Sequence, residues 1–163
     1  MSIFQQTEMQ VYKGIWYSPD KPLIIAAIQQ TNDPEIFRNI LENKNLPTQD
    51  IISESNLTPL AFAIQNNKSF EIIRLIGESL PRSIRQCSIP NLNLPIHWAL
   101  CQKPINKDTI KYLIDCFPDS LNRTNSKGNT PYQVAKIIQT HGNRDITEDI
   151  LQLLEPVANS ESL

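Results

Sequence analysis

The sequence predicts an all-α protein in which short helix-turn-helix units stack into a solenoid, and three observations lead to this prediction. A short pattern with a proline and an alanine recurs along the chain at almost equal intervals. Each copy is followed by a stretch whose apolar residues have helical spacing. The segments between copies are rich in Asn, Ser, Asp and Pro, which favour turns. The chain of 163 residues is therefore expected to fold as a single domain of repeated units.

The recurring pattern is expected to start the first helix of each unit. Its four copies read KPLIIAA, TPLAFAI, LPIHWAL and TPYQVAK. The aligned residues are Pro22, Pro59, Pro95 and Pro131, and Ala26, Ala63, Ala99 and Ala135. Proline suits the first turn of a helix, where a missing N–H costs no hydrogen bond. Thr58 and Thr130 stand just before two of these prolines, where a hydroxyl can cap free backbone N–H groups.

A second helix is predicted in each unit from a longer apolar pattern. The four stretches read PEIFRNILE, SFEIIRLIGE, DTIKYLIDC and ITEDILQLLE. Residues such as Ile72, Leu75 and Ile76 recur at helical spacing, which places them on one face. A single unit cannot bury such a face alone, so we expect neighbouring units to cover it by stacking. Gly128 is the only glycine in the turns between units, so we expect some Asn, Ser or Asp residues there to take left-handed backbone geometry.

Both ends of the array need a cap, because a terminal unit has a neighbour on one side only. We expect capping helices at both ends. Residues 3–16 would form the N-terminal cap through Phe4, Val11, Tyr12, Ile15 and Trp16. Residues 145–155 would form the C-terminal cap, with acidic residues early and Pro156 after its end. The polar tail, residues 156–163, is expected to fray.

The fourth copy, LNRTNSKGNTPYQVA, resembles the ankyrin repeat, whose units carry a turn, a Gly-x-Thr-Pro-Leu-His-x-Ala motif and two antiparallel helices. The resemblance covers residues 17–154; it is good in the second and third copies and degenerate in the first. It implies an ankyrin-like solenoid within one domain, residues 1–155, with repeats at 17–53, 54–89, 90–125 and 126–155. The copies exceed the family's period of about 33 residues and lack its glycine between the helices, so longer and irregular helix junctions are expected.

The stretch NLPIHWAL, with Cys101 directly after it, admits two interpretations. Trp98 aligns with apolar residues in the other copies, so we interpret it as part of the packed core. His97 occupies the histidine position of the ankyrin motif, which implies hydrogen bonds to the turn backbone. The alternative is a thiol-dependent enzyme or redox sensor centred on Cys101 and His97, which are close enough in sequence to share a helix face. We identify no Asp, Asn or second His that would orient such a pair as a catalytic dyad requires, so we favour the non-catalytic interpretation.

Composition narrows the function classes further. The net charge of −2 and the scattered lysines and arginines provide no basic field, so we expect no nucleic-acid partner. No apolar run approaches a membrane span or a signal peptide, so we expect a cytoplasmic chain without membrane insertion. The three separated cysteines and two histidines predict neither disulfides nor a metal site, and no cofactor-binding motif is present. With capped ends and no long heptad pattern, we expect a monomer.

A surface for protein binding is what the resemblance implies. In ankyrin-repeat proteins the partner binds a concave side made of turn tips and inner helices. Carried over position by position, the candidate partner-binding residues are Tyr17, Asp20, Glu54, Leu57, Gln65, Asn66, Asn91, Asn93, Cys101, Gln102, Lys127 and Asn129. This set is mostly neutral and polar, which suits hydrogen bonding to a folded protein or peptide rather than long-range electrostatic steering.

The origin of the partner is a further hypothesis. The chain is rich in Ile, Asn and Gln and poor in Ala and Gly, which indicates an AT-rich genome. Small ankyrin-like proteins of intracellular bacteria with such composition are often delivered into host cells as virulence effectors. By this analogy, we expect an effector secreted into the host cytoplasm without a signal peptide, and the partner would be a host protein. The tail, with Glu155, Glu161 and its serines, loosely resembles a type IV secretion signal. The Met-Ser start and the polar tail favour a whole small protein over a scaffold segment of a larger one.

Overall fold

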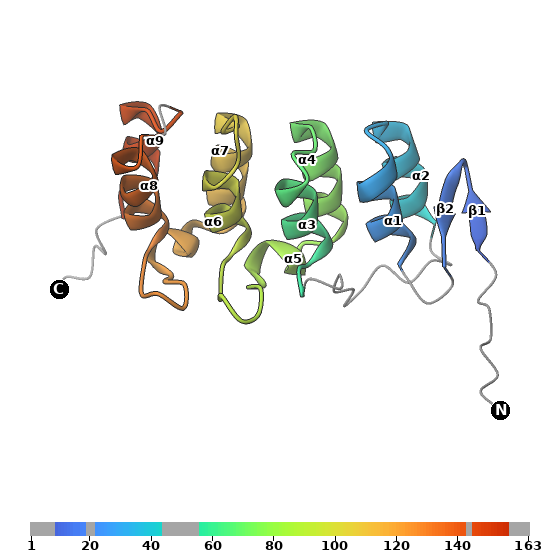
Figure 1. Ribbon diagram of the computed structural model, residues 1–163, viewed down its shortest axis with the longest axis horizontal. Coiled ribbons are helices and arrows are strands. Elements are labelled where there is room, and N and C mark those ends of the chain that lie inside the picture. The colour runs from blue at the N-terminus through green and yellow to red at the C-terminus, as the bar shows by residue number, and fades with distance from the viewer. Residues whose placement is uncertain (1–8, 19–21, 44–55, 143–144, 157–163) are drawn as a thin grey trace.

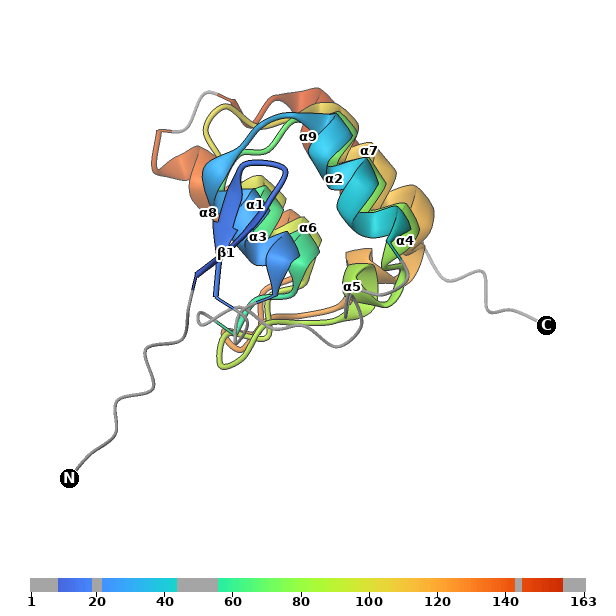
Figure 2. The same ribbon diagram turned by 90° about the vertical axis from the view of Figure 1, so that its right-hand side faces the viewer.

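The computed structural model describes residues 9–18, 22–43, 56–142 and 145–156, and most of the regular secondary structure in these ranges is helical. Figure 1 shows helix pairs standing side by side in a line, with a strand hairpin at one end. Seen along that line, the first helices of the pairs lie in one row and the second helices in another (Figure 2). We call these the inner row and the outer row. The all-α prediction is confirmed in this coarse sense for the described residues.

The inner row consists of α1 (Leu23–Gln30), α3 (Pro59–Gln65), α6 (Pro95–Leu100) and α8 (Pro131–Thr140). Each helix contacts the next one in the row. All four begin at, or directly after, a proline of the recurring pattern, as predicted. The hydroxyls of Thr58 and Thr130 accept hydrogen bonds from Ala61 N (3.2 Å) and Gln133 N (3.4 Å). Two of the four helices are therefore capped as expected.

The outer row consists of α2 (Pro34–Glu42), α4 (Phe70–Ser79), α7 (Lys107–Cys116) and α9 (Glu148–Leu153). Side-chain oxygens of Asp33, Ser69 and Asn106 cap the first three, because each accepts a backbone N–H of the first turn. α2 contacts α4, α4 contacts α7, and α9 packs against α8. The C-terminal capping helix is thus present, although it begins after Thr147 rather than at residue 145. The tail from residue 157 onward lies outside the described residues.

One continuous core lies between the two rows. The recurring alanines, Ala26, Ala63, Ala99 and Ala135, are all buried in it. A methyl group at this position leaves room for larger buried residues of the outer row, among them Phe37, Ile72 and Ile110. Close packing therefore explains why the alanine keeps its register along the sequence.

Two short helices that were not predicted from the sequence follow the outer helices. α5 (Arg82–Arg85) comes after α4, and the 3₁₀ helix η1 (Pro118–Asn122) comes after α7. Each buries one apolar side chain in the core, Ile84 and Leu121 respectively. They occupy the segments by which the chain returns from the outer row to the next turn.

The N-terminal capping helix is a wrong prediction for the described residues, because a β-hairpin stands in its place. β1 (Gln10–Tyr12) pairs antiparallel with β2 (Ile15–Tyr17). Lys13 and Gly14 both have positive φ, 46° and 85°, as a two-residue hairpin turn of type I′ requires. Lys13 and Gly14 therefore form a turn between two short apolar stretches. A helix would instead need residues with helical backbone geometry throughout.

The hairpin still covers the first helix of the inner row. Ile15 is buried, and β2 contacts α1. The side-chain amide of Gln30 bonds the backbone of Trp16 twice: Trp16 N donates to Oε1 (3.0 Å), and Nε2 donates to Trp16 O (2.6 Å). Val11 and Trp16, which were expected inside the cap, are instead exposed to solvent, Trp16 by 57%. Phe4 lies outside the described residues.

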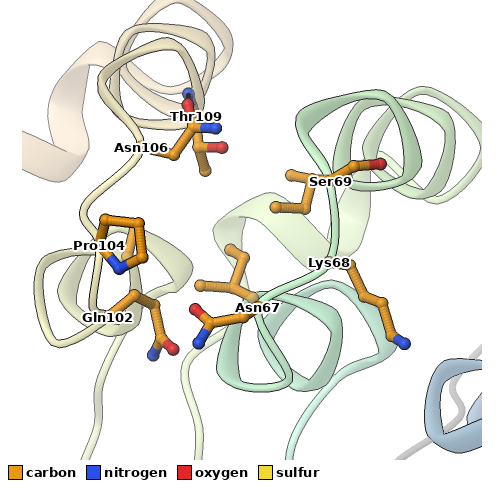
Figure 3. Close-up of a pocket in the computed structure, with 10 residues that line it drawn as sticks. Asn67, Lys68, Ser69, Gln102, Pro104, Asn106 and Thr109 are labelled. Carbon is orange, nitrogen blue, oxygen red and sulfur yellow. Dashed lines mark hydrogen bonds between the residues drawn. The ribbon is translucent and has the colours of Figure 1, made fainter. Parts of the chain in front are cut away.

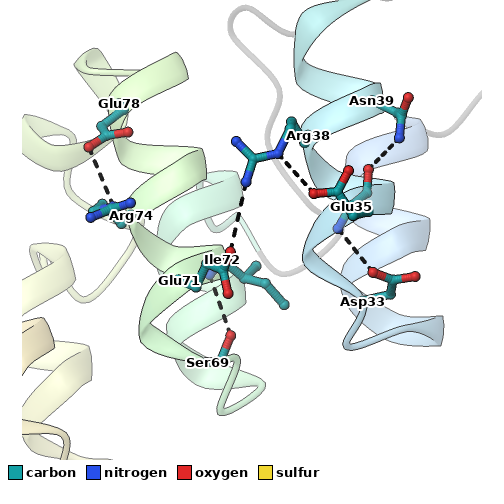
Figure 4. Close-up of polar contacts among 9 residues, drawn as sticks. All are labelled: Asp33, Glu35, Arg38, Asn39, Ser69, Glu71, Ile72, Arg74 and Glu78. Carbon is teal, nitrogen blue, oxygen red and sulfur yellow. Dashed lines mark hydrogen bonds and ion pairs between the residues drawn. The ribbon is translucent and has the colours of Figure 1, made fainter.

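Charged side chains occupy the solvent side of the outer row, as Figure 4 shows. Arg38 on α2 pairs with Glu35 (Nε–Oε1, 3.1 Å) and reaches Glu71 on α4 (Nη2–Oε1, 3.8 Å). Arg74 pairs with Glu78 on α4 (Nε–Oε1, 3.6 Å). All these side chains are exposed, so such pairs contribute little to stability.

Candidate functional site

The turns that precede α6 and α8 are held together by their backbones. Ser126 N donates to Asn91 O across the two turns at 2.9 Å. Within the second turn, Oδ1 of Asn125 accepts hydrogen bonds from Lys127 N (3.0 Å) and Asn129 N (3.1 Å). The two turns are therefore joined through the main chain, and the side chain of Asn125 fixes the backbone of the second turn.

Each of these turns, and the turn before α3, has one residue in the left-handed conformation three positions before the recurring proline. The residue is Asn56 (φ 56°) before α3, Leu92 (φ 52°) before α6 and Gly128 (φ 76°) before α8. Glycine adopts this conformation freely and asparagine tolerates it, whereas a bulky residue is strained there. The expectation of a left-handed Asn is confirmed at Asn56. Leu92 was not foreseen, and because it is 45% exposed, burial does not offset its strain.

A groove of about 290 Å³ lies between the turns before α6 and α8 and the helix α8. We call it the turn groove. It is lined by five of the candidate partner-binding residues, Asn91, Asn93, Cys101, Lys127 and Asn129. These residues come from two copies of the recurring unit. The structure therefore brings part of the predicted set together in one depression.

The turn groove combines amide groups with an apolar wall from α8. Ile137 in this wall is 43% exposed. The Oδ1 atom of Asn93 is buried and has no hydrogen-bond partner among the described residues. Lys127 is the one described residue lining the groove that carries a full charge at neutral pH. The groove is thus suited to an apolar side chain with hydrogen-bonding groups beside it.

His97 also lines the turn groove, but its ring is engaged by the backbone. Nδ1 accepts a hydrogen bond from Leu94 N (3.1 Å), so the ring proton is on Nε2, which donates to Asn129 O (3.3 Å). Burial lowers the pKa of His97, and the bond to Asn129 opposes this only in part. The neutral ring therefore links the residue before α6 to the turn before α8. Its geometry agrees with the structural role expected for this histidine.

Cys101, the other member of the alternative thiol pair, follows α6 directly. The residue is exposed as a whole, but partial desolvation of its thiol raises the pKa, which favours the protonated form at neutral pH. A catalytic thiol needs the opposite shift and a base within reach, and both ring nitrogens of His97 already have backbone partners. In the ranges that the structure describes, no group of three or more His, Cys, Asp or Glu side chains could hold a metal ion.

The remaining candidate residues do not gather in the turn groove. Tyr17 lies in the hairpin, where its hydroxyl donates to Oε1 of Gln10 (2.8 Å). Gln65 and Asn66 are exposed at the end of α3. Two further candidates, Asp20 and Glu54, lie outside the described residues.

Gln102 and Leu57 also lie away from the turn groove. Gln102 lines a different cavity, between the second and third helix pairs. Leu57 is a wrong prediction as a contact residue, because it is 2% exposed and belongs to the core. It aligns with Asn93 and Asn129, two positions before the recurring proline. That position is the base of the turn rather than its tip, so an apolar residue there packs inward.

The apolar residues of the turn groove, Val134, Ile137 and Ile138, were missed from the sequence. They are apolar residues at helical spacing, which is also the pattern of a core-facing stripe. Ile137 and Ile138 align with Cys101 and Gln102, the residues that follow α6. α8 has 10 residues and α6 has 6, so the last turn of α8 extends beyond the end of its neighbour. A comparison of the expected helix lengths, rather than of residue types, would have indicated that these residues line a groove.

Within the described ranges, no helix combines the length and the apolar character needed to cross a membrane. Comparison of the chain with protein-family models, with curated proteins and with solved structures finds no match in any of the three.

Proposed function

We propose that this chain is a non-catalytic protein-interaction module, an ankyrin-like array that binds a partner protein through its turns and inner helices. The turn groove is the observation that carries the proposal. Five residues selected from the sequence line it, together with an exposed apolar wall. An apolar pocket surrounded by hydrogen-bonding groups is the usual form of a binding hot spot.

The repetition of one structural plan supports the ankyrin-like assignment. In the second, third and fourth units, a left-handed turn residue is followed by a helix-starting proline and a buried alanine. An antiparallel outer helix then completes the unit, as Figure 2 shows for the two rows. Ankyrin repeats have the same order of turn and two helices.

The turns are suited to binding because they are fixed before a partner arrives. The hydrogen bond from Ser126 N to Asn91 O and those accepted by Asn125 hold the backbone in place. Less conformational entropy is then lost on association. Exposed Ile137 would supply the apolar anchor, and the side chains of Asn91 and Lys127 beside it would form hydrogen bonds with the partner. With Lys127 as the single charge of the described lining, binding should depend only weakly on salt.

The test compares a groove variant with a matched control. Asn91→Ala, Lys127→Ala and Ile137→Ala together remove side chains of the turn groove. The control carries Glu71→Ala, Arg74→Ala and Lys111→Ala on the exposed side of the outer row. Each full-length protein is immobilised and incubated with lysate of the source cells and with lysate of candidate host cells. The captured proteins are identified by mass spectrometry, and the melting temperatures confirm that all three proteins are folded.

We expect a partner that the wild type and the control retain and the groove variant loses. With that partner purified, calorimetry should show binding to the groove variant weakened at least about tenfold, which is about 1.4 kcal/mol. A partner from the host lysate would support the effector hypothesis, and one from the source lysate would oppose it. Loss of binding in the control alone would move the site to the outer row. Alkylation of Cys101 far faster than that of free cysteine at neutral pH would favour the thiol enzyme instead.

A further inference from the structure

A second cavity lies at the other end of the inner helices from the turns. It has a volume of about 220 Å³, is open to solvent on one side, and is bordered by the ends of α3 and α6 and the beginnings of α4 and α7. We call it the junction cavity. The side-chain amides of Asn67, Gln102 and Asn106 line it, and the buried Ile64 and Ile73 form its apolar side. Figure 3 shows these polar residues arranged around one space, with contributions from both helix pairs.

Thr109 in the junction cavity has a hydroxyl without a partner. The residue is 2% exposed, and its Oγ1 has no hydrogen-bond partner among the described residues. Its backbone N is satisfied, because it donates to Oδ1 of Asn106 at 3.0 Å. A buried hydroxyl without a partner destabilises a fold, so it calls for an explanation. Threonine in a helix divides between two χ1 rotamers, so this hydroxyl can change its direction without a change of the backbone.

The charges around the junction cavity favour an uncharged ligand. Lys68 is the one described residue in the lining that carries a charge at neutral pH. Its Nζ donates to Thr31 O (2.8 Å) and Asn32 Oδ1 (2.7 Å), and Figure 3 shows the side chain pointing away from the other labelled residues. Glu71 and Asp108 stand in the first turns of α4 and α7, where they offset the positive ends of both helices. An anion would therefore gain little electrostatic stabilisation here.

We propose that the junction cavity binds a small uncharged ligand that has an apolar body and a polar group able both to donate and to accept hydrogen bonds, as a primary amide does. The hydroxyl of Thr109 can donate and accept in the same way. Of the amides, Gln102 already donates through Nε2 to Trp98 O (3.1 Å) and Asn106 already accepts through Oδ1, so Gln102 offers an acceptor and Asn106 a donor. The volume is below the range of about 300–1,000 Å³ that holds drug-sized ligands, so the ligand is of the size of one substituted ring. This inference is independent of the turn groove.

Benzamide and benzoate are suitable probes, because they have nearly the same shape and differ in charge. Each is titrated into the full-length, ¹⁵N-labelled protein while the backbone amide resonances are followed. We expect benzamide to shift the resonances of Asn67, Gln102 and Asn106 in a saturable way at low millimolar concentration. Benzoate should bind at least about tenfold more weakly.

Thr109→Val keeps the shape of the side chain and removes the hydroxyl. This variant should lose the saturable response to benzamide and should melt at a higher temperature than the wild type, because the unpartnered hydroxyl is gone. Thr124→Val, at an exposed position, is the matched control and should bind as the wild type does. If Thr109→Val folds poorly, Gln102→Leu replaces it, with the same expected loss of binding.

Three results would overturn the proposal. One is the absence of a saturable response to benzamide at the residues of the junction cavity in the wild type. Another is equal binding of benzamide and benzoate. The third is unchanged binding in Thr109→Val, which would identify the free hydroxyl as a packing defect only.

Discussion

Burial sets the protonation state of His97. Its neutral ring accepts a hydrogen bond from Leu94 N and donates one to Asn129 O, and burial lowers its pKa below the usual value of about 6.5. The unfolded chain therefore takes up a proton at a higher pH than the folded chain does. Stability from this residue is complete above about pH 6.5 and decreases as the pH falls below that value.

A glutamine at position 97 tests this protonation state. Gln133 occupies the equivalent position in the fourth unit, where its Oε1 accepts a hydrogen bond from Thr130 N (2.8 Å). His97→Gln should keep the bond from Leu94 N, lose the bond to Asn129 O, and cost about 1 kcal/mol at neutral pH. Because glutamine does not titrate, the melting temperature of the variant should fall less than that of the wild type between about pH 7 and pH 5. Calorimetry over this pH range measures both values, and equal slopes would contradict a buried neutral ring.

The left-handed conformation of Leu92 is a second property of a single residue that can be tested. We expect Leu92→Asn to increase the free energy of unfolding by about 1 kcal/mol, because asparagine tolerates positive φ and little burial is lost. The reverse change at the equivalent position, Asn56→Leu, should decrease it by a similar amount. Urea denaturation measures both. A less stable Leu92→Asn protein would show that this leucine has a packing role.

Residue-level features were predictable only where the residue type carries a conformational signature. Gly128 marked the left-handed turn position, and the two threonine caps were predicted and are confirmed. A left-handed leucine has no such signature, so Leu92 could not be foreseen. Leu57 was misplaced because alignment gives a position in the turn but does not distinguish its tip from its base.

At the scale of elements, Gly77 governs how closely α4 and α7 pack. A Cβ atom at this position would overlap the hydroxyl of Tyr112 on α7. The ring of Tyr112 also meets Phe70 of α4 edge-on, with centroids 6.0 Å apart. Glycine inside a helix is about 1 kcal/mol less favourable than alanine, so its presence indicates a steric requirement.

Gly77→Ala should therefore destabilise the protein in spite of the better helix propensity. Tyr112→Phe removes the overlapping hydroxyl, so the double variant Gly77→Ala, Tyr112→Phe should regain stability relative to Gly77→Ala. The coupling between the two sites is obtained from urea denaturation of the four proteins. If Gly77→Ala alone stabilises by about 1 kcal/mol, the contact with Tyr112 imposes no constraint.

The long helices were predictable because a buried stripe repeats at helical spacing, as in α2 and α4. The hairpin was missed for the opposite reason. Each of its strands has three residues, too few for a convincing alternation of buried and exposed positions. The remaining signal was Lys13-Gly14 between two apolar stretches, which is a hairpin signature when the flanking segments are read as strands.

At the scale of the whole molecule, the turn groove depends on how two units sit against each other. The repeated pattern predicted that the turns lie on one face. It could not predict that α8 is longer than α6, or that Ser126 N donates a hydrogen bond to Asn91 O across the turns. Both features follow from tertiary packing. The longer α8 provides the apolar wall, and the hydrogen bond holds the two turns that border the groove.

We expect the molecule to be a monomer at micromolar concentration. The largest exposed apolar side chains of the hairpin are Met9, Val11 and Trp16. Three side chains are few beside the roughly 20–30 residues per partner that a stable interface involves. Light scattering on the full-length protein tests this. If it shows a dimer, the double variant Val11→Lys, Trp16→Lys tests whether the hairpin forms the contact. Two charges on each hairpin would then repel each other, and the variant should be a monomer.

The two tryptophans of the chain stand in contrasting environments. Trp16 is largely open to solvent in the terminal hairpin, whereas the indole of Trp98 is partly buried in the third helix pair and donates to Ser88 Oγ at 3.3 Å. Their fluorescence should separate accordingly: emission from Trp16 should be quenched readily by iodide, and emission from Trp98 should be more protected. Trp16→Phe and Trp98→Phe proteins would each retain one emitter. Denaturation followed with these two proteins would show whether the N-terminal end of the row melts before its middle, as a one-dimensional array of neighbouring units allows.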